Sequence, residues 1–270
     1  MATGREDPGP PGVRPAEKDP AVTGMGTRPA GTASRSSALP LQRMFDSVHR
    51  YYDRSNRVLT LGCDQRWRRR CIEQLLAERP RRVLDLCCGT GDMALWLARL
   101  AAADCRIVAL DFSRPMLETA RAKAERLGPG PRIEFVEGDA AALPFPAAHF
   151  DGVTLGFAFR NLTYHNPRRE RCLAELHRVL RPGGHLVFAE TSQPAWRPWR
   201  AAVHLYHRLV VRHAGAWLGG NRDAYRYLAQ SAADYLSAPQ VVELLAAAGF
   251  REPGYRHLLG GVAAIFSARA

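Results

Sequence analysis

A short run of small and acidic residues is the feature of the 270-residue sequence that most clearly points to chemistry. An apolar segment from Val83 leads into the pattern acid-x-small-x-Gly-x-Gly, in which Asp85 is the acid and Gly89 and Gly91 are the glycines. Glycines let a ligand approach the backbone closely, and a helix that begins after such a turn offers free N–H groups. The dinucleotide fingerprint GxGxxG is not met, because no glycine occupies its third position. The run predicts a cofactor-binding turn between a strand and a helix.

Two further acids follow apolar runs downstream of this turn. Asp111 ends one run, 20 residues after Gly91, and Asp139 follows the next. A carboxylate at a strand tip can accept hydrogen bonds from both hydroxyls of a ribose, in nicotinamide and adenosyl cofactors alike. The alternative interpretation is that both acids are solvated turn residues. Their shared register with Asp85 favours a nucleoside-containing cofactor.

The elements that must position these residues follow an α/β pattern. From Arg81 onward, apolar β-rich runs alternate with segments of helical period, which is typical of βαβ units around a parallel sheet. Ser113 is the expected N-cap of the second helix after the turn, and Gly128 its expected C-cap. The expected strands are Arg82–Leu86, Arg106–Leu110, Ile133–Glu137, Asp151–Gly156 and His185–Glu190; the expected helices are Met93–Ala101, Pro115–Leu127 and Pro167–Leu180.

The pattern changes after Glu190. Residues 194–236 are rich in aromatic residues and arginine, and we expect a helical insertion that covers a site. A short amphipathic helix is expected over Ala238–Ala248. Two apolar runs, Tyr255–Leu259 and Val262–Ala268, then flank Gly260-Gly261, which predicts a tight hairpin that closes the sheet with an antiparallel pair.

Composition limits the other possibilities. Residues 1–40 hold seven Pro and six Gly and few large apolar side chains, so we expect a disordered leader before a single domain at 41–270. Met25 is a candidate alternative start of translation. No run of 18 apolar residues and no secretory signal is present, and the six cysteines show no CxxC spacing, which favours a reduced, cytoplasmic protein.

The net charge of +12 invites a nucleic-acid or anionic-membrane interpretation. However, Lys18 and Lys123 are the only lysines among 38 basic residues, and such an arginine bias also arises from GC-rich codon usage. The total charge is therefore a weak signal, and the placement of the arginines matters more.

The acid-bearing turn resembles motif I of the class I S-adenosylmethionine-dependent methyltransferases. This resemblance implies a Rossmann-like fold with a mostly parallel seven-stranded sheet, a C-terminal antiparallel hairpin and helices on both faces. It also implies that Asp85, or its neighbour Asp92, lies near the cationic methionine end of the cofactor. Asp111 would bind the ribose, and Asp139 the adenine amino group with the Ala140 backbone beside it. The remaining implied cofactor contacts are Gly89, Thr90, Gly91 and Gly156.

Two sequence motifs that are missing from the chain limit the classes of substrate to be considered. The Asn/Asp-Pro-Pro-aromatic motif of amino-methylating DNA and RNA enzymes is missing after the fourth expected strand, which continues Phe157-Ala158-Phe159. No cysteine follows a proline, so the nucleophile typical of cytosine-carbon methylation is missing as well. Both absences disfavour a nucleic-acid substrate.

Longer stretches resemble the UbiE/MenG family of ubiquinone and menaquinone biosynthesis C-methyltransferases, over roughly residues 43–268. The specific parts are a Tyr52-Asp53 block that runs to Trp67 and a Phe-x-x-Arg-Asn segment that ends at Asn161. Departures include Ser55, where the family usually has Met, and Gly156, which is often Ser in relatives and leaves only backbone contact with the cofactor. The other supporting stretches are Met44–Val48, Ala142–Pro146, Arg178–Gly184 and Asp223–Leu228.

The family resemblance implies methyl transfer to a ring carbon of a polyprenylated quinol. Demethylmenaquinol is the first candidate, and the 2-methoxy-6-polyprenyl-1,4-benzoquinol of the ubiquinone route is the second. Arg160 and Asn161 would face the ring oxygens, with Arg160 stabilising a developing phenolate. Tyr52 and Asp53 would close the cofactor pocket and assist proton transfer. His49 is an alternative base, interpreted instead as an exposed helix residue.

The aromatic and arginine residues of 194–236 suggest a cover that admits a polyprenyl tail and rests on anionic lipid. Ordinary packing with solvated arginines is the alternative. No metal site is expected; the expected partners are the quinol, an anionic membrane surface and a second copy of the chain, and nucleic acid is not expected. The residues concerned are Trp196, Trp199, Tyr206, Trp217 and Tyr225, among Arg197, Arg200, Arg208, Arg212 and Arg222.

Two rival functions remain open from the sequence. One is methylation of another small molecule, such as a polyketide or sterol-like ring. The other is an RNA-binding methyltransferase or a non-catalytic adenosyl-binding module. The missing amino-methylation motif argues against RNA, and the intact acids argue against a non-catalytic module.

Overall fold

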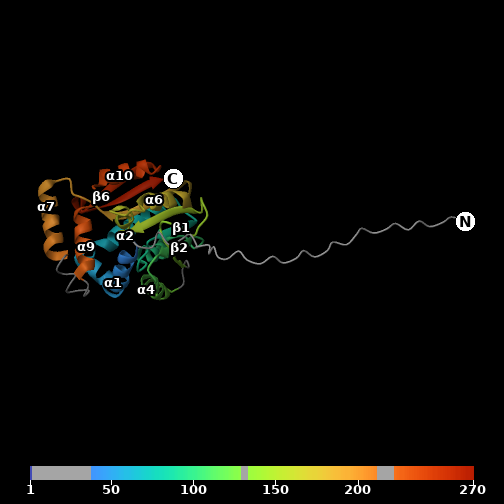
Figure 1. Ribbon diagram of the computed structural model, residues 1–270, viewed down its shortest axis with the longest axis horizontal. Coiled ribbons are helices and arrows are strands. Elements are labelled where there is room, and N and C mark those ends of the chain that lie inside the picture. Colours follow the sequence, from blue (N-terminus) through green and yellow to red (C-terminus); the bar gives the residue numbers. More distant parts are fainter. Residues whose placement is uncertain (2–37, 129–132, 212–221) are drawn as a thin grey trace, which may run out of the picture. The chain divides into compact units, whose positions relative to one another are not determined.

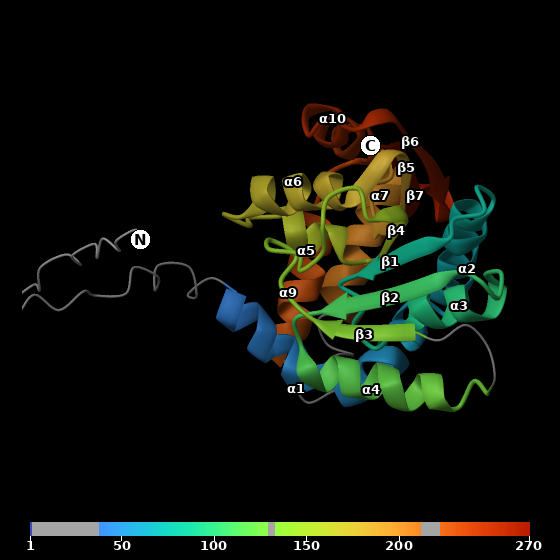
Figure 2. The same ribbon diagram turned by 90° about the vertical axis from the view of Figure 1, so that its right-hand side faces the viewer.

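The computed structural model describes Met1 and residues 38–128, 133–211 and 222–270. The described residues form one seven-stranded sheet within an α/β body (Figure 1). The strand order is β3-β2-β1-β4-β5-β7-β6, and β7 runs in the opposite direction to the other six strands (Figure 2). The leader predicted for residues 1–40 lies outside the described residues, apart from Met1 and the start of the first helix. The strands are β1 (Arg82–Leu86), β2 (Arg106–Asp111), β3 (Ile133–Glu137), β4 (Phe150–Gly156), β5 (Leu180–Thr191), β6 (Arg251–Leu258) and β7 (Ala263–Arg269).

Helices cover both faces of the sheet (Figure 2). The alternation of side chains along each buried strand explains this, because successive residues point to opposite faces. Val83 packs into the core beneath α2 and α3, and its neighbour Leu84 packs into the core beneath α5, α6 and α10. The helices are α1 (Ala38–Leu59), α2 (Cys63–Leu76), α3 (Asp92–Leu100), α4 (Arg114–Glu125), α5 (Phe159–Thr163), α6 (Arg169–Val179), α7 (Arg197–Tyr206), α9 (Arg222–Ala233) and α10 (Ala238–Ala247).

Most of the predicted elements are confirmed. The expected α/β fold with a C-terminal antiparallel hairpin is present, and the predicted helices match the observed ones within two residues at each end. β5 is longer than predicted, because it begins at Leu180 and continues to Thr191. The hairpin is connected by residues 259–262 through a short 3₁₀ turn, so the connection is longer than the Gly-Gly dipeptide alone suggests.

The caps of α4 show one correct and one incorrect prediction. Ser113 is the N-cap, and its side chain accepts a hydrogen bond from the backbone N–H of Met116. The predicted C-cap, Gly128, is wrong by two residues, because the helix ends at the cap residue Arg126. Gly128 has a φ of +77°, so it supplies the left-handed residue just beyond the helix end.

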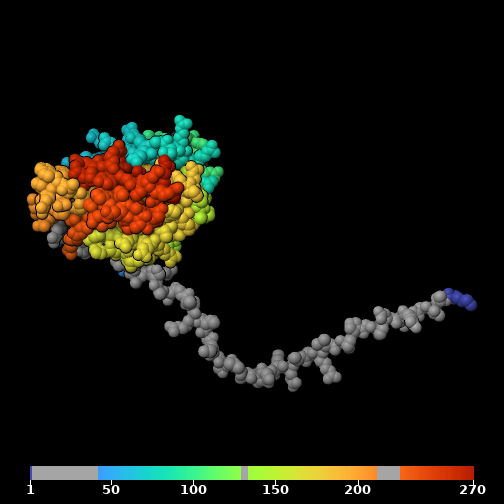
Figure 3. All heavy atoms as spheres, turned by 90° about the horizontal axis from the view of Figure 1, so that it is seen from above, coloured from blue at the N-terminus to red at the C-terminus, as the bar shows by residue number. Residues whose placement is uncertain are grey.

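The helical insertion predicted for residues 194–236 is present in the described residues. α7 continues into a π-helical turn, His207–Val211, and α9 follows residues that lie outside the described range. Figure 3 shows the C-terminal segment in red as a continuous surface that borders the orange α7. Trp217 and Arg212 are outside the described residues, as are the side chains of Tyr225 and Arg222.

The long helix α1 was not predicted as an element of defined bounds. It is hydrogen-bonded to the loop that follows β2. The Gln42 amide donates to the Phe112 carbonyl at 2.9 Å, and the Ser113 hydroxyl donates to the Asp46 carboxylate at 2.5 Å. α1 therefore lies against the edge of the sheet at which the predicted cofactor residues stand.

Candidate active site

The predicted cofactor turn is a left-handed bend between β1 and α3. Cys87, Gly89 and Gly91 have φ angles of +55°, +54° and +83°. A Cβ placed on Gly89 would meet nothing within 4 Å, so the backbone there is open to an approaching ligand. A Cβ on Gly91 would lie 2.9 Å from the Cβ of Ala120 in α4. The turn is thus open at its first glycine and closely packed at its second.

This difference predicts unequal stability effects for two otherwise similar substitutions. Gly91→Ala should lower the free energy of unfolding by roughly 2–4 kcal/mol, because α4 must shift to accept the methyl group and the backbone is left-handed there. Gly89→Ala is the matched control, with only the left-handed backbone penalty of about 1 kcal/mol. Urea unfolding of the cofactor-free protein measures both. Equal losses for the two variants would contradict the packing assigned to Gly91.

Asp85 is fully buried beneath the turn. Its Oδ2 accepts a hydrogen bond from the N–H of Ala94 at 2.9 Å, in the first turn of α3, and its Oδ1 is buried with no partner. Burial raises the pKa of Asp85 to about 8. A buried carboxylate is costly unless a cation pairs with it, so the free oxygen is suited to a cationic group of a ligand.

Asp111 stands at the tip of β2 and is also buried. Its two carboxylate oxygens accept hydrogen bonds from the N–H of Gly89 at 2.8 Å and from the N–H of Ser113 at 2.9 Å. Burial raises the pKa of Asp111 to about 6, against the opposing effect of these hydrogen bonds. The structure therefore brings the second predicted acid directly against the glycine turn.

Asp139 and Ala140 follow β3 on the same edge of the sheet. Asp139 accepts a hydrogen bond from the N–H of Ala141 at 2.9 Å, and its second oxygen pairs with Arg168. The Asp139 side chain is 45% exposed, and Ala140 is buried beside it. The three acids thus lie at successive strand ends, with the exposure falling from Asp139 to Asp85.

Thr90 links the turn to α1. Its hydroxyl donates to Oδ1 of Asp53 at 2.5 Å, and Oδ2 of Asp53 accepts from Lys123 at 2.7 Å. Lys123 also donates to Asp92 at 2.5 Å. Asp53 therefore ties α1 to the cofactor turn, which fits a role in closing the cofactor pocket.

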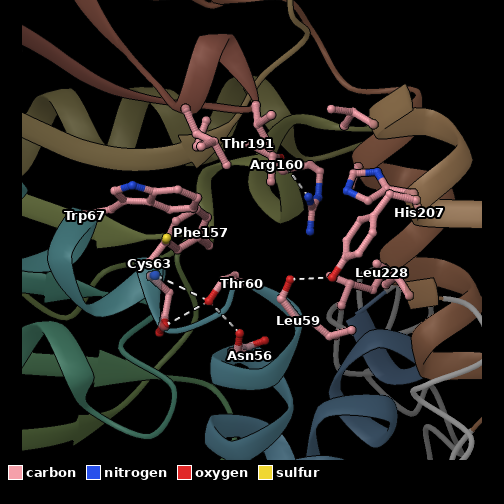
Figure 4. A pocket seen from close by; sticks show the side chains of 18 of the residues that line it. Asn56, Leu59, Thr60, Cys63, Trp67, Phe157, Arg160, Thr191, His207 and Leu228 are labelled. Atoms are coloured by element: carbon pink, nitrogen blue, oxygen red, sulfur yellow. Dashed lines mark hydrogen bonds between the residues drawn. The ribbon is translucent and has the colours of Figure 1, made fainter. Parts of the chain in front are cut away.

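A cavity of about 550 Å³ lies between α1, α2, α5, α7 and α9 (Figure 4). Its lining is mainly apolar and aromatic, with Trp67 and Phe157 on one side and the α7 region on the other. Among the predicted catalytic residues, Tyr52, Arg160 and Asn161 line it. Asp53 does not line it, so the structure separates Asp53 from its sequence neighbour Tyr52.

Arg160 follows β4, in the first turn of α5, and only 3% of the residue is exposed. Its Nη1 donates to the Thr191 hydroxyl at 2.8 Å and lies 3.8 Å from the buried carboxylate of Glu190. Its Nε is buried with no partner. In Figure 4 the guanidinium projects into the cavity beside His207. The position holds a fixed cation next to apolar walls.

Tyr52 and Asn161 contribute polar groups to the same cavity. Burial raises the pKa of Tyr52, so its phenol remains protonated at neutral pH. The Asn161 side-chain oxygen accepts a hydrogen bond from the hydroxyl of Tyr227 in α9 at 3.3 Å. His49 lies elsewhere on α1, partly buried, with Nδ1 2.7 Å from the Asp46 carbonyl.

Gly156 ends β4 beside the cavity. A Cβ there would lie 2.2 Å from Nη1 of Arg68 and 2.7 Å from Cγ of Met93. The guanidinium of Arg68 therefore occupies the space that a side chain at position 156 would need. The carbonyl of Gly156 accepts a hydrogen bond from the same Nη1 at 3.4 Å.

Three residues of the site were not found from the sequence. Arg68 and His207 line the cavity, and Lys123 joins Asp53 to Asp92. Burial and the neighbouring Arg160 lower the pKa of His207 to about 4, so its imidazole is neutral at pH 7. A signal for Arg68 was available, because Asp64 precedes it by four residues and places both on one face of α2.

The cysteine side chains lie in mostly buried surroundings. All six cysteines are free thiols, and burial raises the pKa of both Cys87 and Cys88 well above the ordinary value. In residues 38–128, 133–211 and 222–270, no group of three or more His, Cys, Asp or Glu side chains is arranged to hold a metal ion. Within the same ranges no helix is long and apolar enough to cross a membrane.

Comparison with known proteins agrees with this geometry. The model of the ubiE/COQ5 methyltransferase family matches residues 32–269. The demethylmenaquinone methyltransferase of Thermus thermophilus is 42% identical over 222 residues, covering 82% of this chain and 97% of the relative. The enzyme of the same name from Deinococcus radiodurans is 41% identical over 241 residues, covering 88% of this chain and 96% of the relative.

Solved structures share the fold at lower identity. A SAM-dependent methyltransferase from Aquifex aeolicus superposes with a TM-score of 0.51 at 20% identity, covering 73% of this chain and 88% of its own. A protein from Nostoc punctiforme described as a putative O-methyltransferase superposes with a TM-score of 0.56 at 16% identity, covering 75% of this chain and 55% of its own. These structures confirm the predicted fold, and the family match confirms the predicted methyltransferase activity. The chain belongs to the ubiE/COQ5 methyltransferase family.

Proposed function

We propose that this methyltransferase transfers a methyl group from S-adenosylmethionine to a ring carbon of a polyprenylated quinol, with demethylmenaquinol as the preferred substrate. The observation that carries the proposal is Arg160, a buried guanidinium that projects into a mainly apolar cavity. Such a cavity suits a naphthoquinol ring and the start of its prenyl tail, and the cation suits an oxygen that becomes negative. The name of the relatives at 41–42% identity supports the same substrate.

The residues at the glycine turn fit S-adenosylmethionine. The unpaired Oδ1 of Asp85 suits the ammonium of its methionine part, and the open backbone at Gly89 leaves room for the ligand. Asp111 would hold the ribose and Asp139 the adenine amino group, with Ala140 beside it. When bound, the cofactor supplies an electrophilic methyl group on a sulfonium.

The protein contributes positioning, exclusion of water and control of charge. Loss of the proton from a ring hydroxyl makes the neighbouring ring carbon nucleophilic; the new carbon–carbon bond then forms as the carbon–sulfur bond breaks. Arg160 stabilises the negative oxygen, because its charge lies in a site shielded from water. Asn161 and the protonated phenol of Tyr52 orient the ring through hydrogen bonds. On rearomatisation the methylated ring carbon would lose its proton and the product oxygen would regain one, so that one proton would leave the site to bulk solvent in each turnover.

The pKa of Asp85 predicts a pH dependence of cofactor binding. Because the free carboxyl has a pKa of about 8, it is mostly protonated at pH 7 and must release a proton to pair with an ammonium. At pH values below that pKa, the affinity for S-adenosylhomocysteine should increase by up to about tenfold for each unit by which the pH is raised. Titration calorimetry at several pH values measures this slope. Asp85→Asn should bind more weakly and lose the slope; a slope retained in that variant would contradict the assignment.

Product analysis tests the substrate. Purified protein is incubated with S-adenosylmethionine and either demethylmenaquinol or the 2-methoxy-6-polyprenyl-1,4-benzoquinol. The masses of the products are then measured by mass spectrometry. The proposal expects a one-methyl gain on demethylmenaquinol at the higher kcat/KM. Methylation of neither quinol would reject the proposed substrate class.

The region around the cavity supports contact with an anionic membrane. The exposed apolar residues near the cavity, called the rim here, come from three places: Leu61 on the α1–α2 turn, Leu259 on the β6–β7 turn, and Trp196 at the N-cap of α7 with Leu205 on α7 and Leu209 on the π-helical turn. Leu61 is 90% exposed and Trp196 is 70% exposed, which is unusual for large apolar side chains. Leu61 and Leu259 of the rim also line the cavity, and the exposed residues Arg197 and Arg208 lie close to other rim members in sequence.

Liposome flotation tests this surface. The double variant Leu205→Asp/Leu209→Asp should bind anionic vesicles at least about tenfold more weakly than the wild type, since it loses apolar area and adds negative charge. Leu100→Asp is the matched control, because Leu100 is 38% exposed on α3 and is not part of the rim. Absence of wild-type binding to anionic vesicles, or equal loss in the control, would reject the membrane contact.

A further inference from the structure

Arg68 lies between the cofactor turn and the substrate cavity. The residue is 5% exposed, lines the cavity from α2, and its guanidinium lies 5.2 Å from the ring centre of Phe157. Its Nη1 meets the carbonyl of Gly156 at the end of β4. On the other side, Asp92 begins α3 directly after the turn. Arg68 therefore lies near the first residue after the cofactor turn and also lines the substrate cavity.

The guanidinium is buried without full pairing. Its Nε has no hydrogen-bond partner, although it lies 3.7 Å from Oδ2 of Asp64 and 3.9 Å from Oδ2 of Asp92. The hydrogen bond from Nη1 to the Gly156 carbonyl is long, at 3.4 Å. A guanidinium has five N–H donors in a planar fork that matches a carboxylate. Buried charges are normally paired at closer range, so this donor set is arranged for an anionic group that arrives with a ligand.

Its aspartate neighbours have other close partners. Asp92 accepts from Lys123 at 2.5 Å and from Gln65 at 2.8 Å. Asp64 accepts from Thr60 at 3.0 Å and from Gln65 at 2.9 Å. The carboxylates therefore supply a balancing charge near Arg68 without occupying its hydrogen-bonding fork.

The amino-acid end of S-adenosylmethionine carries an ammonium and a carboxylate on the same carbon. We propose that Arg68 binds this carboxylate, opposite the acid that receives the ammonium, and so sets the position of the sulfonium at the cavity. The proposal rests on the cofactor orientation in the proposed function. Gly156 permits this arrangement, because any side chain there would take the space of Nη1.

Binding measurements with two ligands test the proposal. S-adenosylmethionine and decarboxylated S-adenosylmethionine differ by the carboxylate alone, and calorimetry gives the affinity of each in the absence of quinol. The wild type should prefer the carboxylate-bearing ligand by about 10- to 100-fold, the range expected for hydrogen bonds to a charged group. Arg68→Met should reduce this preference to about threefold or less, mainly by weakening S-adenosylmethionine.

Arg68→Lys is the companion variant, because it keeps the charge near Asp64 and Asp92 and loses the planar fork. Arg68→Lys should prefer S-adenosylmethionine over the decarboxylated ligand to an intermediate degree. Its thermal unfolding midpoint shows that it is folded, so it tests the proposal even if Arg68→Met does not fold. An equal loss for both ligands would assign Arg68 a structural role and overturn the proposal. An unchanged preference would also overturn it. Since no quinol is present, failure of the quinol assignment leaves this result unaffected.

Discussion

Replacing Arg160 with methionine should lower kcat for quinol methylation by about 10²- to 10³-fold, with less than about a threefold change in affinity for S-adenosylhomocysteine. The guanidinium lies in the cavity and away from the glycine turn, so its loss removes charge stabilisation of the ring oxygen and leaves the cofactor contacts in place. Stopped-time assays with saturating quinol give kcat, and calorimetry gives the cofactor affinity. An equal loss of cofactor binding would contradict the assignment.

Thr191→Val provides a graded control for the Arg160 prediction. The Thr191 hydroxyl accepts from Nη1 of Arg160 at 2.8 Å, and Val keeps the shape of the side chain without that acceptor. The Arg160 guanidinium keeps its charge but loses the hydrogen bond that fixes its position, so kcat should fall by roughly tenfold. A loss as large as that of Arg160→Met would indicate that the Thr191 hydroxyl itself, and not the cation, carries the effect.

Replacing Asp111 with asparagine should weaken S-adenosylhomocysteine binding by roughly 10²-fold. The carboxylate accepts from the N–H groups of Gly89 and Ser113, and the asparagine amide would point an NH₂ group at one of them. The variant therefore disturbs the glycine turn and also removes the charged acceptor for the ribose hydroxyls. Calorimetry with the cofactor product measures the affinity without any turnover.

Asp139→Asn is the matched control for Asp111. Asp139 is 45% exposed and pairs with Arg168 at the edge of the site, so its carboxylate is less desolvated. The expected loss of affinity is less than about fivefold, since asparagine keeps an acceptor oxygen and exposed charges contribute little. A larger effect for Asp139→Asn than for Asp111→Asn would contradict the proposed order of the cofactor contacts.

Much of the fold follows from local sequence patterns. β1 and β2 contain the apolar runs Val83-Leu84 and Ile107–Leu110, because both faces of a parallel sheet are covered, and these runs are visible without a structure. The acids at their ends are placed by the same logic, since parallel strands present their carboxyl ends at one edge. This is why Asp85, Asp111 and Asp139 could be grouped from spacing alone.

The N-terminal part of the site was harder to predict. Tyr52 and Asp53 are adjacent in sequence, and both were expected at one place. In a helix, adjacent residues point about 100° apart, so Tyr52 lines the cavity and Asp53 bonds to Thr90 and Lys123. Sequence proximity therefore predicts a shared role only for residues three or four apart in a helix.

Arg68 and Lys123 were missed for a different reason. Arg68 is one of many arginines and is distinguished by its burial, and Lys123 is one of two lysines and is distinguished by its long-range pairing. Lys123 of α4 reaches Asp53 of α1, 70 residues away in the sequence. Contacts of this kind depend on the packing of helices that are distant in the chain, which residue periodicity does not report.

The central claim is methylation of a quinol ring carbon, and the position of the transferred methyl group tests it most directly. Purified protein is incubated with S-adenosylmethionine carrying a ¹³C-labelled methyl group and with demethylmenaquinol, and the product is examined by NMR. The account predicts the label on a ring carbon beside a ring oxygen, with formation of that product strongly reduced in Arg160→Met. Label on a quinol oxygen, or no labelled quinone at all, would contradict it.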